Sequence, residues 1–204
     1  MNDQELEIKL YLSNFTQVRK RVEELGAAKL QARIHEINLR FDTQDLILSK
    51  KGQVLRLRQD NLARLTFKGP SHSEEGVRAR EEIEFTVDNF HAARKFLTAL
   101  GYQVLMIYEK YRTTYEWKGN HITLDEMPYG DFIEIEGPDP SLIHQICEEI
   151  SLNWNARIFE SYTVLFEQLR QKDGYPFRDL LFENFEDINV TPETLGVQPA
   201  DLQT

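Results

Sequence analysis

Charged and apolar residues alternate at the start of the chain. Glu5, Glu7 and Lys9 are separated by Leu6 and Ile8, and because successive side chains of a β-strand point to opposite faces, the three charges would share one face. The same alternation, with charges of both signs, recurs at residues 36–42, 55–58, 64–68, 80–85, 108–115, 122–125 and 133–136. The pattern predicts a sheet with one charged face, which could close around a polar interior.

Four segments are predicted to be helices. Residues 13–26 and 88–101 carry apolar side chains at helical spacing, and each segment ends in a glycine, which favours a helix terminus there. Residues 140–150 begin with a proline, which is favoured in the first helical turn, and residues 161–172 form the fourth helix. The first two helices each follow a strand and precede further strands. This order of elements indicates a weak two-fold internal repeat.

The composition fits one globular domain with a good core. The 204 residues are 41% hydrophobic and 28% charged. The net charge of −10 argues against binding to duplex nucleic acid, which needs a broad basic surface, but a local basic cluster could still bind a small anion. Cys147 is the only cysteine, which excludes an intrachain disulfide and a cysteine-based zinc site. No signal peptide or long apolar run is recognisable, so we expect a cytoplasmic protein without a membrane partner.

The predicted charged faces carry both signs in equal number. Their acidic members are Glu5, Glu7, Glu82, Glu84, Asp125, Glu134 and Glu136. Their basic members are Lys9, Arg56, Arg58, Lys68, Arg80, Lys110 and Arg112. For a single strand, a solvated outer face is the commoner explanation. For many strands together a functional interior is favoured, because buried charge pairs often stabilise a protein no better than apolar residues of similar volume.

Such an interior has the chemistry needed to hold a triphosphate with a divalent metal. Arginine binds phosphate oxygens through two parallel hydrogen bonds, and carboxylates hold Mg²⁺ or Mn²⁺. The chain lacks the glycine-rich motifs of P-loop enzymes and of Rossmann sites. Its five histidines show no metal-ligand spacing, and Ser161 has no adjacent base that would make it a nucleophile.

A series of short motifs follows in order along residues 1–170, beginning with Glu5-x-Glu7-x-Lys9. The further motifs are Leu25-Gly26-Ala27, Phe41-Asp42-Thr43, Leu55-Arg56-Leu57-Arg58, Leu65-Thr66-Phe67-Lys68-Gly69-Pro70, Arg80-x-Glu82-x-Glu84, Leu100-Gly101-Tyr102, Glu109-Lys110-x-Arg112, Leu124-Asp125 and Gly130-x-Phe132-x-Glu134-Ile135-Glu136-Gly137. In this ordered series the chain resembles the CYTH family, the triphosphate tunnel metalloenzymes.

The resemblance implies a mainly-β α+β fold, in which an eight-stranded antiparallel closed barrel forms a triphosphate tunnel flanked by helices. We expect this tunnel domain to span residues 1–172. Residues 173–204 would form a C-terminal extension that packs on the barrel or on a partner subunit, since they carry several apolar side chains. A homodimer is left open.

The resemblance also implies roles for the charged residues. Metal-binding roles fall to Glu5, Glu7, Asp125, Glu134 and Glu136, with Glu82 and Glu84 nearby. Phosphate-binding roles fall to Lys9, Arg56, Arg58, Lys68, Arg80, Lys110 and Arg112. Lys9, Glu7 and Glu134 are the expected catalytic residues, and Lys9 would orient or deprotonate the nucleophile in hydrolytic members. The implied cofactor is Mg²⁺ or Mn²⁺.

Several reactions are compatible with this set of acidic and basic residues. The family includes class IV adenylyl cyclases, thiamine triphosphatases, inorganic tripolyphosphatases and RNA triphosphatases, and the motif series is most similar to the cyclase-type branch. The first expectation is therefore conversion of ATP to cyclic AMP and pyrophosphate. The alternatives are hydrolysis of tripolyphosphate or thiamine triphosphate at the terminal phosphate, and a non-catalytic module that binds nucleotide or polyphosphate.

Three features depart from the family pattern. Arg40 stands where many members have an aromatic residue, and a side chain at the tunnel mouth there would alter the selection of base or substrate. Glu160 stands where many members have a basic residue, which removes one phosphate contact. The extension from Asp173 has no counterpart in the pattern.

Overall fold

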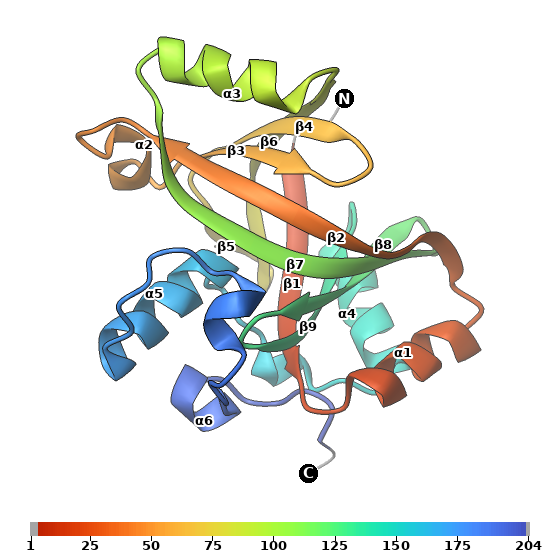
Figure 1. Ribbon diagram of the computed structural model, residues 1–204. Helices are drawn as coiled ribbons and strands as arrows, with labels where there is room; N and C mark the ends of the chain where they lie inside the picture. Colours follow the sequence, from red (N-terminus) through yellow and green to blue (C-terminus); the bar gives the residue numbers. More distant parts are fainter. Residues whose placement is uncertain (1–3, 203–204) are drawn as a thin grey trace.

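The computed structural model describes residues 4–202, in which strands account for more residues than helices (Figure 1). The strands are β1 (Gln4–Leu12), β2 (Ala28–Asp42), β3 (Val54–Gln59), β4 (Ala63–Lys68), β5 (His72–Glu74), β6 (Val77–Val87), β7 (Gln103–Trp117), β8 (Asn120–Met127) and β9 (Gly130–Glu136). The helices are α1 (Phe15–Glu24), α2 (Ile47–Lys50), α3 (Phe90–Ala99), α4 (Pro140–Glu149), α5 (Tyr162–Asp173) and α6 (Pro192–Leu195). Two 3₁₀ turns cover Trp154–Ala156 and Phe182–Phe185.

The strands form one antiparallel sheet that closes into a ring. Neighbouring strands follow the order β1-β9-β8-β7-β2-β3-β4-β6, and β6 pairs again with β1. The short β5 pairs with β6 alongside residues 77–79 and continues the line of β4. This arrangement confirms the predicted mainly-β α+β class and the closed path of eight strands, to which β5 is an addition.

The alternation along β1 separates the two faces of the ring. Leu6, Ile8 and Leu10 point outward into a hydrophobic cluster, whereas Glu7 and Lys9 line the interior. Helices α1 and α4 cover this part of the ring, since Val18, Val22, Ile143 and Ile146 belong to the same cluster. Burial of these apolar side chains is the main force that holds the two helices on the sheet.

Helix α5 and the chain after it cover a second part of the ring. Phe166 and Leu169 of α5 pack with Phe132 of β9, and Phe185 and Leu195 belong to the same cluster. The segment 174–202 also pairs with the sheet through its backbone. The amide of Leu180 donates to the carbonyl of Ile107 at 2.9 Å. The amide of Ala200 donates to the carbonyl of Tyr11, also at 2.9 Å. The domain boundary at residue 172 and a role for the extension in subunit contacts stay predictions.

Helix α3 lies over β3 at the opposite end of the molecule (Figure 1). Its Leu97 packs with Leu39, Phe41 and Leu57. Helices are present in all four segments where the apolar spacing predicts them, whereas the single turn of α2 was not predicted. In residues 4–202 we find no helix with the length and apolar character needed to span a membrane.

Candidate functional site

The ring encloses a cavity of about 520 Å³ that is lined by acidic and basic side chains. Of the 14 residues predicted to form the site, 13 line this cavity: Glu5, Glu7, Lys9, Arg56, Arg58, Lys68, Arg80, Glu82, Glu84, Lys110, Arg112, Glu134 and Glu136. The exception is Asp125, whose side chain is fully buried beside it. The structure thus brings together residues that are up to 131 positions apart in the chain (5 to 136).

Glu5 and Glu7 of β1 have different electrostatic environments. Glu5 accepts hydrogen bonds from Lys68 Nζ at 2.8 Å and from Arg80 Nε at 2.6 Å. Burial alone would raise the pKa of Glu5, but these two cations hold it well below its usual range. Glu7 lies 3.4 Å from Arg78 Nη1 and 3.6 Å from Arg80 Nη2. Its pKa is raised by burial and by the charges of Glu5 and Glu134.

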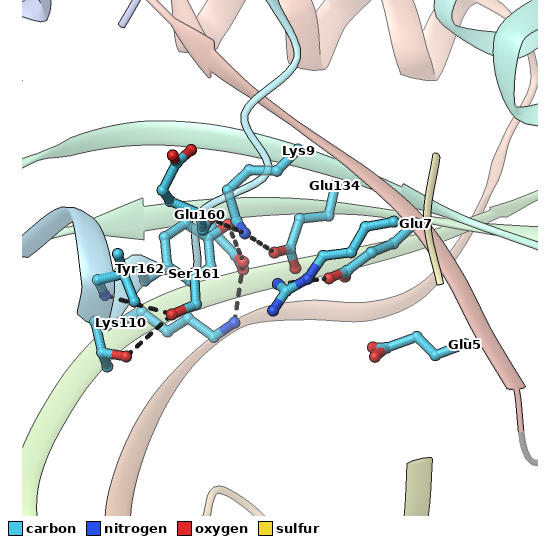
Figure 2. A network of polar contacts seen from close by, with 12 residues as sticks. Glu5, Glu7, Lys9, Lys110, Glu134, Glu160, Ser161 and Tyr162 are labelled. Carbon is cyan, nitrogen blue, oxygen red and sulfur yellow. Dashed lines mark hydrogen bonds and ion pairs between the residues drawn. The ribbon is translucent and has the colours of Figure 1, made fainter. Parts of the chain in front are cut away.

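Glu134 of β9 contacts two cations of the cavity wall, Lys9 and Arg112, and Figure 2 shows its contact with Lys9. Its carboxylate lies 3.3 Å from Lys9 Nζ and accepts a hydrogen bond from Arg112 Nη2 at 2.6 Å. Burial opposes the charge, but Lys9 and Arg112 hold the pKa of Glu134 well below its usual range. Lys9 Nζ also donates to the carbonyl of Glu160 at 3.2 Å and lies 4.4 Å from the ring centre of Tyr162.

Asp125 of β8 holds the basic residues of β7 in place. It accepts hydrogen bonds from Lys110 Nζ at 3.0 Å, from Arg112 Nε at 2.6 Å and from the hydroxyl of Tyr162 at 2.9 Å. These contacts engage both carboxylate oxygens. In this arrangement Asp125 positions Lys110 and Arg112 toward the cavity, and its direct metal role stays a prediction.

The wall made by β2, β3 and β6 is rich in arginine. Arg56 Nη2 and Arg58 Nη2 donate to the two oxygens of Glu84 at 3.3 and 3.0 Å. Glu36 of β2 lies 3.5 Å from Arg58 Nη1 and 3.7 Å from Lys110 Nζ. Burial would raise the pKa of Glu36, but Lys110, with the arginines around it, lowers it to about 2. Arg56 keeps its charge, because its acidic neighbours outweigh the effect of burial and raise its pKa.

Comparison with known proteins identifies this architecture. A family model of the CYTH domain matches residues 3–161. The chain belongs to the CYTH domain family. No curated protein matches the sequence.

Solved structures share the CYTH fold with this chain. A candidate adenylate cyclase from Vibrio parahaemolyticus superposes with a TM-score of 0.72 at 20% identity, over 82% of this chain and 99% of its own. A protein from Pyrococcus horikoshii OT3 gives a TM-score of 0.66 at 26% identity, over 80% and 99%. A candidate adenylyl cyclase from Hippeastrum, described as having a dominant triphosphatase activity, gives 0.61 at 22% identity, over 80% and 95%.

The carboxylates of this CYTH domain suit a divalent cation chemically. Within residues 4–202 no three His, Cys, Asp or Glu side chains are arranged around a common metal position, since most carboxylates point to basic neighbours. Glu7 and Glu136, however, lie directly opposite each other on β1 and β9. Partial desolvation, followed by the charges of Glu5 and Glu7, raises the pKa of Glu136 to about 7, although solvent at this exposed side chain weakens the effect. A cation among these carboxylates would replace repulsion by attraction.

The cavity also contains residues that the sequence prediction left out of the site. The charged ones and those of α5 are Glu36, Arg40, Asp60, Arg64, Arg78, Ser161, Tyr162 and Thr163, and the others are Leu30, Gln31, Val54, Tyr108, Thr114, His121 and Thr123. Four of them continue the alternation of their strands and could have been found by that signal: Glu36 and Arg40 on β2, Arg64 on β4 and Arg78 on β6. Ser161, Tyr162 and Thr163 lie at the start of α5 and reach the cavity only through tertiary packing. Glu160, one of the departures from the family pattern, has an exposed side chain and takes part through its backbone carbonyl.

Proposed function

We propose that this CYTH protein is a metal-dependent enzyme that cleaves a triphosphate inside its cavity. The observation that carries the proposal is the lining: among the described residues it contains ten Lys or Arg and eight Asp or Glu side chains. Its volume of about 520 Å³ is that of a small-molecule site. Burial of so many charges adds little to stability, so a bound polyanion and its counter-cation give the best account of them.

Hydrolysis of inorganic tripolyphosphate is the reaction that the lining favours. A nucleoside base needs an aromatic or apolar face on which to stack. Tyr162 faces Lys9 and donates its hydroxyl to Asp125, while Tyr108 lies against Arg56. Both tyrosine side chains are therefore occupied by charged neighbours, so that Leu30, Val54 and His121 are the other lining side chains on which a base could rest. The Hippeastrum relative with dominant triphosphatase activity supports the same choice.

Conversion of ATP to cyclic AMP is the second candidate. The order of the motifs is most similar to the cyclase-type branch, and the Vibrio relative is described as a candidate adenylate cyclase. The same cations and carboxylates would serve either reaction, because the product depends on which phosphorus faces the nucleophile. Thiamine triphosphate remains a third substrate to compare.

In the hydrolytic reaction, water attacks the terminal phosphorus and the bridging P–O bond breaks, which releases orthophosphate and pyrophosphate. Arg56 and Arg58 are proposed to bind phosphate oxygens and to stabilise the charge that develops during transfer. Lys9, held by Glu134 and by the Glu160 carbonyl, would orient the attacking oxygen through a hydrogen bond. A divalent cation at Glu7 and Glu136 would neutralise phosphate charge, and Glu5 and Glu134 would join its ligands by exchanging a basic partner for the metal.

Phosphorus NMR with Mg²⁺ or Mn²⁺ tests the proposal. ATP, tripolyphosphate and thiamine triphosphate are offered in parallel, and EDTA replaces the metal in a control. We expect orthophosphate from tripolyphosphate, with no reaction in EDTA. Cyclic AMP with pyrophosphate would instead establish the cyclase. Tight binding without turnover of any substrate would mark a binding module and refute an enzyme.

A further inference from the structure

Arg40 differs from the other cations of the cavity. It lies on β2 and its guanidinium lines the cavity. Nine other Lys and Arg side chains in the described part of the lining each have an ion pair with a carboxylate: Lys9, Arg56, Arg58, Arg64, Lys68, Arg78, Arg80, Lys110 and Arg112. Arg40 has no ion pair within residues 4–202, and its Nη1 donates to the neutral hydroxyl of Thr163 at 2.6 Å.

The surroundings of Arg40 compensate its positive charge only in part. In the β2–β3 pairing it lies directly opposite Arg56, and like charges at such positions repel. Burial lowers the pKa of Arg40; Tyr108 and the charge of Asp42 act against this shift, and the charge of Arg80 adds to it. The nearest carboxylate on its own strand is Asp42, which accepts hydrogen bonds from the amides of Leu48 and Ser49 and from the Ser49 hydroxyl. That carboxylate is therefore used to hold α2.

The start of α5 adds polar groups beside the guanidinium. Ser161 Oγ lies 3.2 Å from Thr163 Oγ1, the acceptor of the Arg40 hydrogen bond. Both side chains line the cavity with Arg40. Ser161 is the N-cap of the 12-residue helix α5 and Thr163 lies in its first turn, at the end where the helix dipole favours negative charge. The two hydroxyls, the N-terminal end of α5 and the guanidinium of Arg40 therefore lie together on one part of the cavity wall.

A purely structural role would be to tie β2 to α5 through the Arg40–Thr163 hydrogen bond. A neutral side chain such as glutamine could make that hydrogen bond without placing a second charge opposite Arg56. A bound anion resolves the repulsion between the two arginines, because it can accept hydrogen bonds from both.

We propose that Arg40, with Ser161 and Thr163, forms a phosphoryl-binding subsite that selects an inorganic polyphosphate over a triphosphate ester. An inorganic chain is anionic at both ends, so it gains from an additional cation, whereas an ester such as ATP carries a nucleoside at one end. The inference rests on the proposed function, since it assigns the substrate selectivity of the same cavity to one residue.

Equilibrium binding without metal tests this subsite separately from catalysis. Isothermal titration calorimetry in EDTA measures the Kd of tripolyphosphate and of ATP for the wild type and for Arg40→Gln. Loss of one charge-assisted contact is expected to weaken tripolyphosphate binding about tenfold and ATP binding much less. Arg33→Gln is the matched control, because Arg33 lies on the same strand, is exposed and pairs with Glu126 outside the cavity.

An equal change for both ligands in Arg40→Gln, or no change, would overturn the selectivity role while leaving the proposed function intact. A wild type that binds neither ligand in EDTA would overturn the subsite, whereas the proposed function fails only if no triphosphate is turned over with Mg²⁺ or Mn²⁺. Circular dichroism and Tm verify that Arg40→Gln is folded. If it is not, Arg40→Lys replaces it. Lysine keeps the charge and loses the planar fork, so a loss confined to tripolyphosphate supports the subsite, and an equal loss for both ligands contradicts it.

Discussion

The two walls of the cavity carry charge in opposite ways. On the β1–β9 wall, Glu7 and Glu136 face each other across the strands, and both have a raised pKa. On the β2–β3 wall, Arg40 and Arg56 face each other instead. Neither pair is favourable in the protein alone. Under the proposed function, this difference suits two ligands of opposite charge, with a cation against one wall and a polyanion against the other.

The largest effect is expected from Glu134→Gln on the acidic wall. The substitution removes a carboxylate from the candidate metal site and the partner of Lys9 and Arg112. The rate of phosphate release from tripolyphosphate should fall by about 100-fold or more, while the circular dichroism spectrum stays that of the wild type. Glu81→Gln, an exposed change on β6, is the control. Wild-type activity of Glu134→Gln would remove this residue from the reaction.

On the basic wall, the double variant Arg56→Ala/Arg58→Ala should lose affinity for the polyanion. Two charge-assisted phosphate contacts are removed, so the Kd of tripolyphosphate should rise by about 100-fold. Calorimetry in EDTA gives this value without interference from turnover. If the binding were unchanged, these charged faces would be no more than a scaffold, and the comparison between the two walls would fail.

A third prediction concerns acid stability through Glu36. Its folded pKa, about 2, lies below the ordinary 4.5. The contribution of Glu36 to the free energy of unfolding is therefore present above pH 4.5 and is lost as the pH falls through about 2. This contribution amounts to about 3 kcal/mol at most. Glu36→Gln should lose this contribution, so the difference in unfolding free energy between wild type and variant should shrink from pH 5 to pH 2. A difference that does not change with pH would contradict the ion pairs of Glu36 with Arg58 and Lys110.

The smallest effect is expected from Glu136. Its pKa is shifted upward, in the opposite direction to the pKa of Glu36. Its folded pKa of about 7 lies above 4.5, so its stabilising contribution is present below pH 4.5 and is lost as the pH rises through 7. In EDTA, Glu136→Gln should therefore gain stability relative to wild type between pH 5 and pH 8. Thermal unfolding at both pH values measures this gain, and addition of Mg²⁺ should reduce it. A constant difference in Tm would show that the carboxylates of this wall do not repel each other.

The period of two along the strands could predict a charged sheet face able to close around a polar interior, whereas the closed eight-stranded barrel was predicted from the resemblance to the CYTH family. That period also placed 13 site residues on the inner face. It could not predict their partners, because pairs such as Glu5 with Arg80 depend on the register between β1 and β6. Asp125 shows the same limit: alternation places it inward, but only packing shows that Lys110, Arg112 and Tyr162 cover it.

The contributions of α5 were the least predictable part of the site. Ser161 and Thr163 belong to a helix whose sequence pattern indicates only its apolar face, and the position of its first turn at the cavity depends on the packing of Phe166 and Leu169 on the sheet. Arg40 could be seen in the sequence as an unusual residue. Its lack of a carboxylate partner in the described part of the chain is a property of the folded structure.

The most direct test of the two-walled cavity is a crystal structure with Mn²⁺ and a tripolyphosphate analogue whose bridging oxygens are replaced by imido groups. The account predicts an anomalous Mn²⁺ peak beside Glu5, Glu7, Glu134 and Glu136, and phosphorus atoms beside Arg40, Arg56 and Arg58. A polyphosphate outside the ring, or a cation away from the β1–β9 wall, would contradict it.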